Sequence, residues 1–374
     1  MAQLQIISAL RSTILSGLVG LVAQPHVTWA QGAPASAEPP IQDCTMASPR
    51  SRAATLSSAL RQGFGVQYWG DTYSAEKLAA QPHGLLIIEF TKIGAHYSDT
   101  GRELPFTPQE IATISRDGKR PVLGYLNVSE IETYRDYWID LGPLGESGEP
   151  QPLPPWHGPH TGNGDHLSAY WTQDWKDILL ARVDRLMGAG ASGLFLDDVL
   201  HYYSHALDET VRWPEGERPA GPSDASGFAL EMMRLVEAVA ERARRWDCNA
   251  LIIVNNGVFI GRDAAGASPA PESRAAFASY LNAIDAIMVE NLSAPDMHSH
   301  ALEALKEDFQ ANGASVLALD IATHFPGVEP EQLRRMVADE AARTGIFPYV
   351  ALDSTYSQLT LPIILSSQAR AAVE

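Results

Sequence analysis

Eight short apolar segments alternate with helix-like segments between Phe64 and Asp353, and this alternation constrains the fold more than any other feature of the sequence. Several of the apolar segments end on an acidic or polar residue, as in Gly193–Asp198, which reads Gly-Leu-Phe-Leu-Asp-Asp. A buried parallel strand has this form when its carboxyl end delivers side chains to a site. The expected strands are Phe64–Tyr68, Leu85–Glu89, Arg120–Leu126, Gly193–Asp198, Leu251–Val254, Ile287–Val289, Ser315–Leu319 and Tyr349–Leu352.

Helical patterns fill the intervals between these strands. Thr107 to Glu110 reads as a capping box with Pro at the first helical position, and apolar residues recur at helical spacing from Phe228 to Val239. Eight alternating units predict one (β/α)8 barrel. Two elongated segments, Gly142–Asp165 and Leu207–Ser226, interrupt the alternation. We expect both to lie over the carboxyl face of the barrel, where this fold binds its ligands, although ordinary surface decoration is the alternative.

Composition limits the classes of partner. The chain has 374 residues, 45% of them hydrophobic, which suits one elaborated barrel. Its formal net charge of −18 argues against nucleic acid or an anionic membrane surface as a partner, because both require a basic patch. A cationic or neutral substrate is more compatible. The only two cysteines, Cys44 and Cys248, exclude a cysteine metal cluster and either form one disulfide or remain free thiols.

The first residues have the pattern of a cleaved export signal. Arg11 precedes the apolar segment Ile14–Ala23, which is too short to span a bilayer, and Thr28-Trp29-Ala30 offers a cleavage site. We therefore expect a signal peptide over residues 1–30 and a secreted or periplasmic protein with no membrane span after cleavage. An uncleaved anchor is the alternative. Residues 31–58 are rich in Ala, Pro and Ser and are expected to form a tether, and residues 59–374 are expected to form the barrel domain.

Five short motifs in order resemble glycoside hydrolase family 114, the endo-α-1,4-polygalactosaminidase-like barrels. The motifs are Val128 to Arg135 with Tyr137-Trp138, Tyr170-Trp171 with Trp175, Gly193 to Asp197, Asn255-Asn256-Gly257, and Val289-Glu290. The resemblance covers residues 64 to 353. It implies a (β/α)8 fold, secretion and retaining endo-cleavage of a galactosamine-containing polysaccharide, and it carries the family's acidic pair over to Asp197 and Glu290. The sequence departs from the family pattern at Val128-Ser129, where a small residue and Gly are usual, and in having Asp198 beside Asp197.

The acidic pair also fits the chemistry on its own terms. Cleaving a glycosidic bond requires one protonated carboxyl group, to assist departure, and one ionised carboxylate, to attack or stabilise the sugar cation. Asp197 suits the nucleophile, whereas Glu290, between apolar neighbours, suits an acid whose pKa is raised by desolvation. Asp198 competes with Asp197 because adjacent strand residues point to opposite sides. Alternatively, both aspartates only cap the next segment.

Further residues are candidates for substrate binding. Acidic side chains at strand ends could contact a protonated amino sugar, with ion pairs to arginines such as Arg135 as the alternative. Aromatic side chains could stack on sugar rings, with core packing as the alternative. His201 and His205 together with the aspartates could hold a metal ion, but further ligands are not evident, so no metal and no cofactor is expected. The candidates are Tyr68, Glu89, Tyr125, Glu130, Glu132, Tyr170, Trp171, Asp198, Tyr202, Asn255 and Asp320.

Two classes of function follow from these residues. The first is a secreted glycoside hydrolase, endo-acting and retaining, that cleaves a cationic α-1,4-linked galactosamine-rich polysaccharide with Asp197 and Glu290. The second is a non-catalytic carbohydrate-binding barrel or a module associated with polysaccharide deacetylation. The separation of the two carboxyl groups distinguishes the classes, because a retaining hydrolase requires about 5 to 5.5 Å and an inverting one about 6.5 to 9.5 Å.

Overall fold

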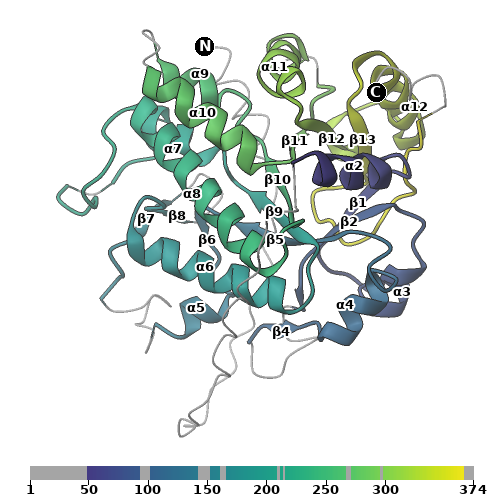
Figure 1. Cartoon of the computed structure of the whole chain (residues 1–374), viewed down its shortest axis with the longest axis horizontal. Coiled ribbons are helices and arrows are strands. Elements are labelled where there is room, and N and C mark those ends of the chain that lie inside the picture. The colour runs from purple at the N-terminus through teal and green to yellow at the C-terminus, as the bar shows by residue number, and fades with distance from the viewer. Residues whose placement is uncertain are drawn as a thin grey trace, which may run out of the picture.

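Eight parallel strands form one sheet that curves into a nearly closed barrel with helices around its outside (Figure 1). The computed structural model describes residues 49–92, 102–141, 152–160, 166–208, 211–213, 215–266, 271–294 and 298–365. In sheet order the strands are β1 (Phe64–Gln67), β2 (Leu85–Ile88), β5 (Val122–Asn127), β9 (Gly193–Asp197), β10 (Leu251–Asn255), β11 (Ala286–Glu290), β12 (Ser315–Ile321) and β13 (Phe347–Ala351). The predicted (β/α)8 fold is confirmed.

The first and last strands meet through side chains and the segments that follow them. The rings of Phe64 in β1 and Tyr349 in β13 lie 5.4 Å apart between centroids. Just beyond the strand ends, the backbone N–H of Tyr68 donates to the carbonyl of Tyr356 at 2.9 Å. These contacts bring the two edges of the sheet together and place the segment after β13 beside the carboxyl end of β1.

Side chains along each strand alternate between the barrel interior and the helix layer, as the twofold periodicity of a strand requires. One buried cluster holds inward residues such as Tyr125, Phe195 and Met288. A second cluster holds their outward neighbours, such as Leu194 and Val289, packed against helices. The residue two places after an inward residue faces inward again, so the alternation directs the last residues of β5, β9, β10 and β11 toward the mouth of the barrel.

The helices begin where the sequence supplies caps and apolar stripes. The capping box from Thr107 to Glu110 is present, and Asp224 accepts a backbone hydrogen bond at the start of the long helix that buries Phe228 and Val239. The helices are α2 (Pro49–Leu60), α3 (Ala75–Ala80), α4 (Pro108–Ile114), α5 (Asp136–Ile139), α6 (Gln173–Gly188), α7 (His201–Leu207), α8 (Ala225–Trp246), α9 (Ile260–Ala265), α10 (Pro271–Ala283), α11 (His298–Ala304) and α12 (Pro330–Thr344), with η2 (Leu305–Phe309), η3 (Gln310–Asn312) and η4 (Ala322–His324).

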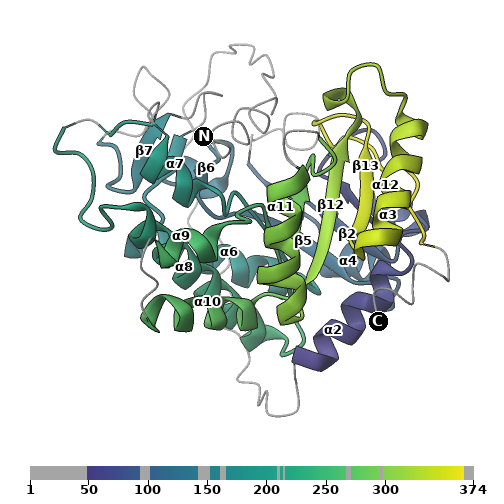
Figure 2. The same ribbon diagram turned by 90° about the horizontal axis from the view of Figure 1, so that it is seen from above.

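Helix α2 covers the amino end of the barrel, opposite β6 and β7 (Figure 2). The prediction of a tether as far as Ser58 is wrong over 49–58, because Leu56 and Leu60 lie one helical turn apart and are buried in the barrel cluster. Arg52, one turn earlier on the same face, pairs with Asp285 just before β11 at 2.9 Å. The rest of the expected tether and the expected signal peptide lie outside the described residues.

Two small antiparallel sheets are added after the carboxyl ends of β2 and β5. They are β3 (Thr91–Lys92) with β4 (Leu104–Pro105), and β6 (Glu130–Ile131), β8 (His166–Ser168) and β7 (His157–His160) in that order. None of the helices in the described part of the chain has the length and apolar character needed to cross a bilayer. Cys248 is disulfide-bonded, and Cys44, the other cysteine of the sequence, lies outside the described residues.

Candidate active site

Three neighbouring strands bring two carboxyl groups and one amide together at the mouth of the barrel. Asp197, Asn255 and Glu290 are the last residues of β9, β10 and β11. The Nδ2 atom of Asn255 donates to Oδ1 of Asp197 at 2.7 Å and to Oε1 of Glu290 at 3.0 Å. Because one nitrogen contacts both oxygens, these oxygens are no further apart than the sum of the two distances.

The surroundings of Glu290 and Asp197 affect the pKa values of the two carboxyl groups differently. Burial, and then the negative charge of Asp197, raise the pKa of Glu290 to about 7, so Glu290 remains partly protonated near neutral pH. Burial also raises the pKa of Asp197, but hydrogen bonds from Asn255, the Asp198 backbone and Tyr125 favour its ionised form. The surroundings therefore favour the proton on Glu290 and the negative charge on Asp197, the division that a general acid and a nucleophile require.

Asp198 turns away from Asp197 toward a different set of partners. Its φ of 60° lies in the left-handed region, and its backbone N–H donates to Oδ1 of Asp197 at 2.9 Å. Its side chain accepts a hydrogen bond from Asn127 at 2.6 Å and lies 3.5 Å from Nε2 of His201. Burial and the charges of Glu130 and Asp197 raise the pKa of Asp198 well above its usual range. The backbone of Asp198 thus orients the carboxylate of Asp197, while the carboxyl group of Asp198 faces Glu130.

Glu130, Asp198 and His201 form a compact cluster beside the acid pair. His201 Nε2 lies 2.9 Å from Glu130 Oε1, and the potential ligand atoms of the three residues lie within 4.8 Å of one another. Such a set could accept a cation, but the hydrogen bond between His201 and Glu130 accounts for the arrangement without one. His205 lies outside this cluster, since its Nε2 bonds the carbonyl of Ser168 at 3.0 Å.

Tyrosines form the floor of the site. The ring of Tyr68 lies 4.7 Å from that of Tyr125 and 5.2 Å from that of Tyr356, between centroids. Burial, followed by the charge of Asp197, raises the pKa of both Tyr68 and Tyr125, so both rings lie beside the acids. Tyr356 lies next to Glu290, and burial and that carboxyl group raise its pKa. Two residues of the site were not predicted from the sequence. Tyr356 follows β13 in a loop without a recognisable motif. Asn127 lies two places after Tyr125 in β5, and this twofold spacing could have predicted that it faces inward.

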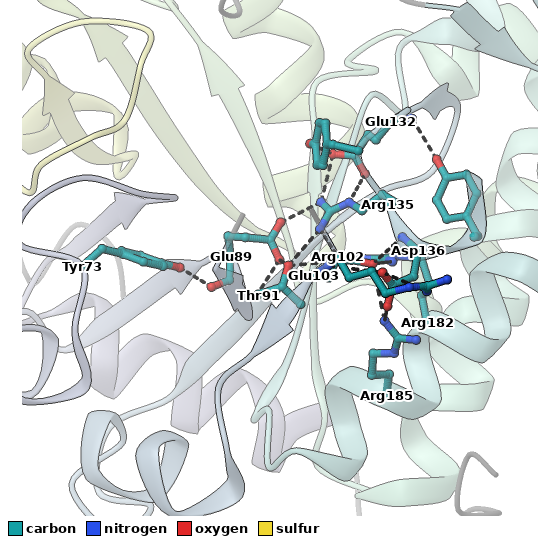
Figure 3. Close-up of polar contacts among 12 residues, drawn as sticks. Tyr73, Glu89, Thr91, Arg102, Glu103, Glu132, Arg135, Asp136, Arg182 and Arg185 are labelled. Carbon is teal, nitrogen blue, oxygen red and sulfur yellow. Dashed lines mark hydrogen bonds and ion pairs between the residues drawn. The ribbon is translucent and has the colours of Figure 1, made fainter. Parts of the chain in front are cut away.

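Glu89 and Glu132 serve an internal ion-pair network around Arg135 rather than an open binding surface (Figure 3). Arg135 is buried and donates to Glu89 at 2.6 Å, to Glu132 at 2.8 Å and to Glu103 at 3.0 Å. Arg182 adds a second cation to Glu103 at 2.9 Å. The alternative of ion pairing to Arg135 therefore describes these two glutamates, because their carboxylates are already neutralised by protein groups.

The structure places four other candidates outside the mouth of the barrel. Asp320 lies two places after Ala318 in β12, so its side chain faces the outer layer as that of Ala318 does. It accepts hydrogen bonds from the backbone N–H and the Oγ hydroxyl of Ser293 at 3.0 and 2.8 Å. Three aromatic candidates pack in the outer core, consistent with the core-packing alternative. Tyr170 donates to the carbonyl of Phe228, Tyr202 donates to Asp263, and Trp171 packs against Trp213 and Phe228.

Comparisons by sequence find relatives of this chain in other organisms. No family model matches the chain. An uncharacterized protein of Deinococcus radiodurans is 26% identical over 341 residues, which cover 89% of this chain and 93% of that protein. An uncharacterized protein of Thermotoga maritima is 27% identical over 176 residues, so this match spans about half of either protein, 46% of each.

Solved structures of glycoside hydrolases resemble the chain in fold. Ega3 of Aspergillus fumigatus, crystallised in complex with galactosamine, has a TM-score of 0.53 at 13% identity and covers 81% of this chain and 96% of its own. The chain shares the barrel fold of Ega3. The glycoside hydrolase domain of PelA from Pseudomonas aeruginosa has a TM-score of 0.49 at 15% identity, with 79% of this chain and 96% of that domain covered. At these identities the likeness concerns the fold, and the chemistry has to be argued from the residues.

Proposed function

We propose that the chain is a secreted glycoside hydrolase that cleaves galactosamine-rich polysaccharide internally and with retention of configuration, as a member of glycoside hydrolase family 114. The observation that carries this proposal is the single nitrogen of Asn255 held 2.7 Å from Asp197 and 3.0 Å from Glu290. The sum of these distances keeps Oδ1 of Asp197 and Oε1 of Glu290 closer together than the separation of about 6.5 to 9.5 Å with which an inverting enzyme admits water between its carboxyl groups. It is compatible with the separation of about 5 to 5.5 Å used in retention.

In the proposed mechanism, the ionised carboxylate of Asp197 attacks the anomeric carbon while Glu290 gives its proton to the departing glycosidic oxygen. The carbon–oxygen bond to the leaving chain breaks as the ester bond to Asp197 forms. Glu290, now ionised, then removes a proton from water as the water oxygen attacks the same carbon and releases Asp197. Asn255 donates to both carboxyl groups and keeps them oriented throughout.

Galactosamine is proposed as the sugar because of the sequence resemblance and the acidic character of the chain. The net charge of −18 favours a polymer that carries protonated amines, and Ega3, which shares the fold, was crystallised with galactosamine. Near the acid pair, Glu130 has a lowered pKa and no arginine partner among the described ion pairs, so its carboxylate is available to a protonated amine. A non-catalytic barrel gives no reason for two carboxyl groups of opposite protonation held by one amide.

Incubation of the purified protein with galactosamine polymers tests the proposal. We expect new reducing ends, a rapid fall in mean chain length, and products whose anomeric configuration matches the substrate when followed by NMR. De-N-acetylated and fully acetylated polymers should be compared in parallel. Product of inverted configuration would contradict the retaining mechanism, and the absence of cleavage in every galactosamine polymer would contradict the proposed substrate.

The activity is expected to depend on pH with a basic limit set by Glu290. Because the general acid must be protonated, kcat/KM should fall as the pH rises through the Glu290 pKa of about 7. On the acid side kcat/KM should fall again where Asp197 becomes protonated, which gives a bell-shaped profile. Initial rates at low substrate concentration across this range measure both limits. A profile that stays flat from pH 6 to pH 9 would show that Glu290 is not the proton donor.

Salt should weaken activity on a cationic polymer. The summed negative charge of the protein attracts protonated amines, and this attraction is screened as the screening length shrinks from roughly 30 Å at 0.01 M to 3 Å at 1 M ionic strength. We expect the initial rate at subsaturating de-N-acetylated polymer to fall over that range. The rate on acetylated polymer should be lower and less dependent on salt. Equal salt dependence for both polymers would exclude charge attraction as a source of substrate preference.

A further inference from the structure

We propose that Trp69 and Tyr134 are two sugar-stacking platforms on the rim of the barrel, each of which binds a pyranose ring of the polymer away from the cleaved linkage. This inference rests on the proposed function and adds binding subsites to it. Of the large exposed apolar and aromatic side chains in the described residues, these two are the aromatic ones, with 40% and 43% of their surface exposed. Both follow the carboxyl ends of barrel strands, β1 for Trp69 and β5 for Tyr134.

Trp69 is held beside the Glu290 part of the site. It directly follows Tyr68, and its indole N–H donates to the carbonyl of Thr355 at 2.6 Å. The next residue, Tyr356, accepts the backbone N–H of Tyr68 at 2.9 Å and lies next to Glu290. The hydrogen bond fixes the orientation of the indole ring while much of its surface stays open. A ring that is already oriented loses little conformational entropy when it binds a ligand.

Tyr134 is held beside the Arg135 network. Its hydroxyl donates to Glu132, which also accepts from Arg135. The guanidinium of Arg135 lies 4.9 Å from the centroid of the Tyr134 ring, a favourable arrangement of a cation and an aromatic face. Because Arg135 is itself held by Glu89, the ring is supported from the protein side and exposes its remaining surface to solvent.

The chemistry of these two residues fits a sugar ring. Tyr and Trp supply a large, flat and rigid contact area and keep a polar group for hydrogen bonding. The C–H groups on one face of a pyranose ring can pack on such a surface. Other exposed apolar side chains do not share these features. Met336, for example, is 46% exposed but lies on the outer helix α12, away from the strand ends, where single exposed apolar residues are ordinary.

Binding measurements on an uncleaving protein test the platforms. The full chain carrying Glu290→Gln is titrated with a short and a long galactosamine oligosaccharide by calorimetry. Adding Trp69→Ala or Tyr134→Ala should weaken binding of the long oligosaccharide by roughly five- to tenfold. The short oligosaccharide, confined to the acid pair, should bind nearly as before. Trp69→Phe and Tyr134→Phe keep a flat ring but lose the hydrogen bonds, and should retain most of the affinity.

Met336→Ala is the control for removing an exposed apolar side chain, and it should bind like the parent. Parent-like binding of the long oligosaccharide by both alanine variants would overturn the inference. Phenylalanine variants as weak as the alanine variants would also overturn it, since the hydrogen bonds and not the rings would then matter. Cleavage by the protein with Glu290 intact is assayed separately. Binding that depends on the rings without any cleavage would refute the proposed function and leave the platforms standing.

Discussion

Replacing either member of the acid pair is expected to abolish polysaccharide cleavage while the barrel stays folded. Glu290→Gln should lower kcat by roughly 10²- to 10⁴-fold, because the leaving oxygen must then depart without a proton. Asp197→Asn should lower kcat by at least about 10⁴-fold, because the amide cannot form the ester intermediate. Reducing-end assays give the rates, and circular dichroism of each variant verifies the fold.

An activated leaving group separates the two roles. A galactosamine derivative whose leaving group departs without protonation should restore much of the turnover of Glu290→Gln, since only the proton is missing. The same compound should not rescue Asp197→Asn, which lacks the nucleophile. Rescue of Asp197→Asn alone would reverse the assignment of the two residues.

Asp198→Asn is the matched control for this pair. Asp198 has a strongly raised pKa, and asparagine has nearly the shape of a protonated aspartate and tolerates the left-handed conformation at φ 60°. We therefore expect Asp198→Asn to retain far more activity than Asp197→Asn. If Asp198→Asn were inactive while Asp197→Asn kept near wild-type turnover, Asp198 would be the nucleophile and the inward parity of β9 would not decide which aspartate acts.

Replacing Arg135 with Met is expected to destabilise the fold by about 3 to 5 kcal/mol, the usual cost of leaving buried charges without their partner. The substitution removes the cation shared by Glu89, Glu103 and Glu132. Urea unfolding followed by fluorescence measures the loss. Arg245→Ala is the control, because Arg245 and its partner Glu241 are 55% and 68% exposed, and such pairs contribute at most about 1 kcal/mol.

The same network should make the wild-type protein less stable in acid. Burial alone would raise the pKa of Glu103, but Arg182 and Arg135 hold it well below its ordinary value of 4.5. A carboxyl group with a lowered pKa stabilises the fold above its unfolded pKa, and this contribution is lost as the pH falls below that value. Arg135→Met should therefore lose less stability between pH 5 and pH 2 than the wild type does. If the difference in unfolding free energy between the wild type and Arg135→Met were the same at every pH, Arg135 would act by packing alone.

Local sequence patterns were sufficient to predict most of the strands and helices of the barrel. Short apolar runs predicted all eight strands. The twofold alternation showed that only one of Asp197 and Asp198 could face the barrel interior, and the structure identifies it as Asp197, two places after the inward Phe195. The alternation also explains why Asp320 faces Ser293, since it shares the parity of Ala318. That error came from treating every acidic residue at a strand end as equivalent.

Contacts between distant segments could not be read in this way. Glu89 and Arg135 are 46 positions apart, and the sequence left their ion pair as one of two alternatives without a signal that decided between them. Tyr356 enters the site from the segment after the last strand, where no periodic pattern predicts its position. Helix α2 was concealed by the Ala- and Ser-rich composition of the stretch before Ser58, although Leu56 and Leu60 have the spacing of a buried helical face.

Helix α2 and the acid pair lie at opposite ends of the barrel, which bears on how the protein would be oriented at a surface. It closes the amino end of the barrel, with Ser51 bonded to Asn249 and Arg52 to Asp285, both just ahead of strands, whereas Asp197 and Glu290 lie at the other end. The chain therefore enters the fold on the side facing away from the acids. If a surface held the chain by the residues before Pro49, the end of the barrel that carries Asp197 and Glu290 would point away from that surface.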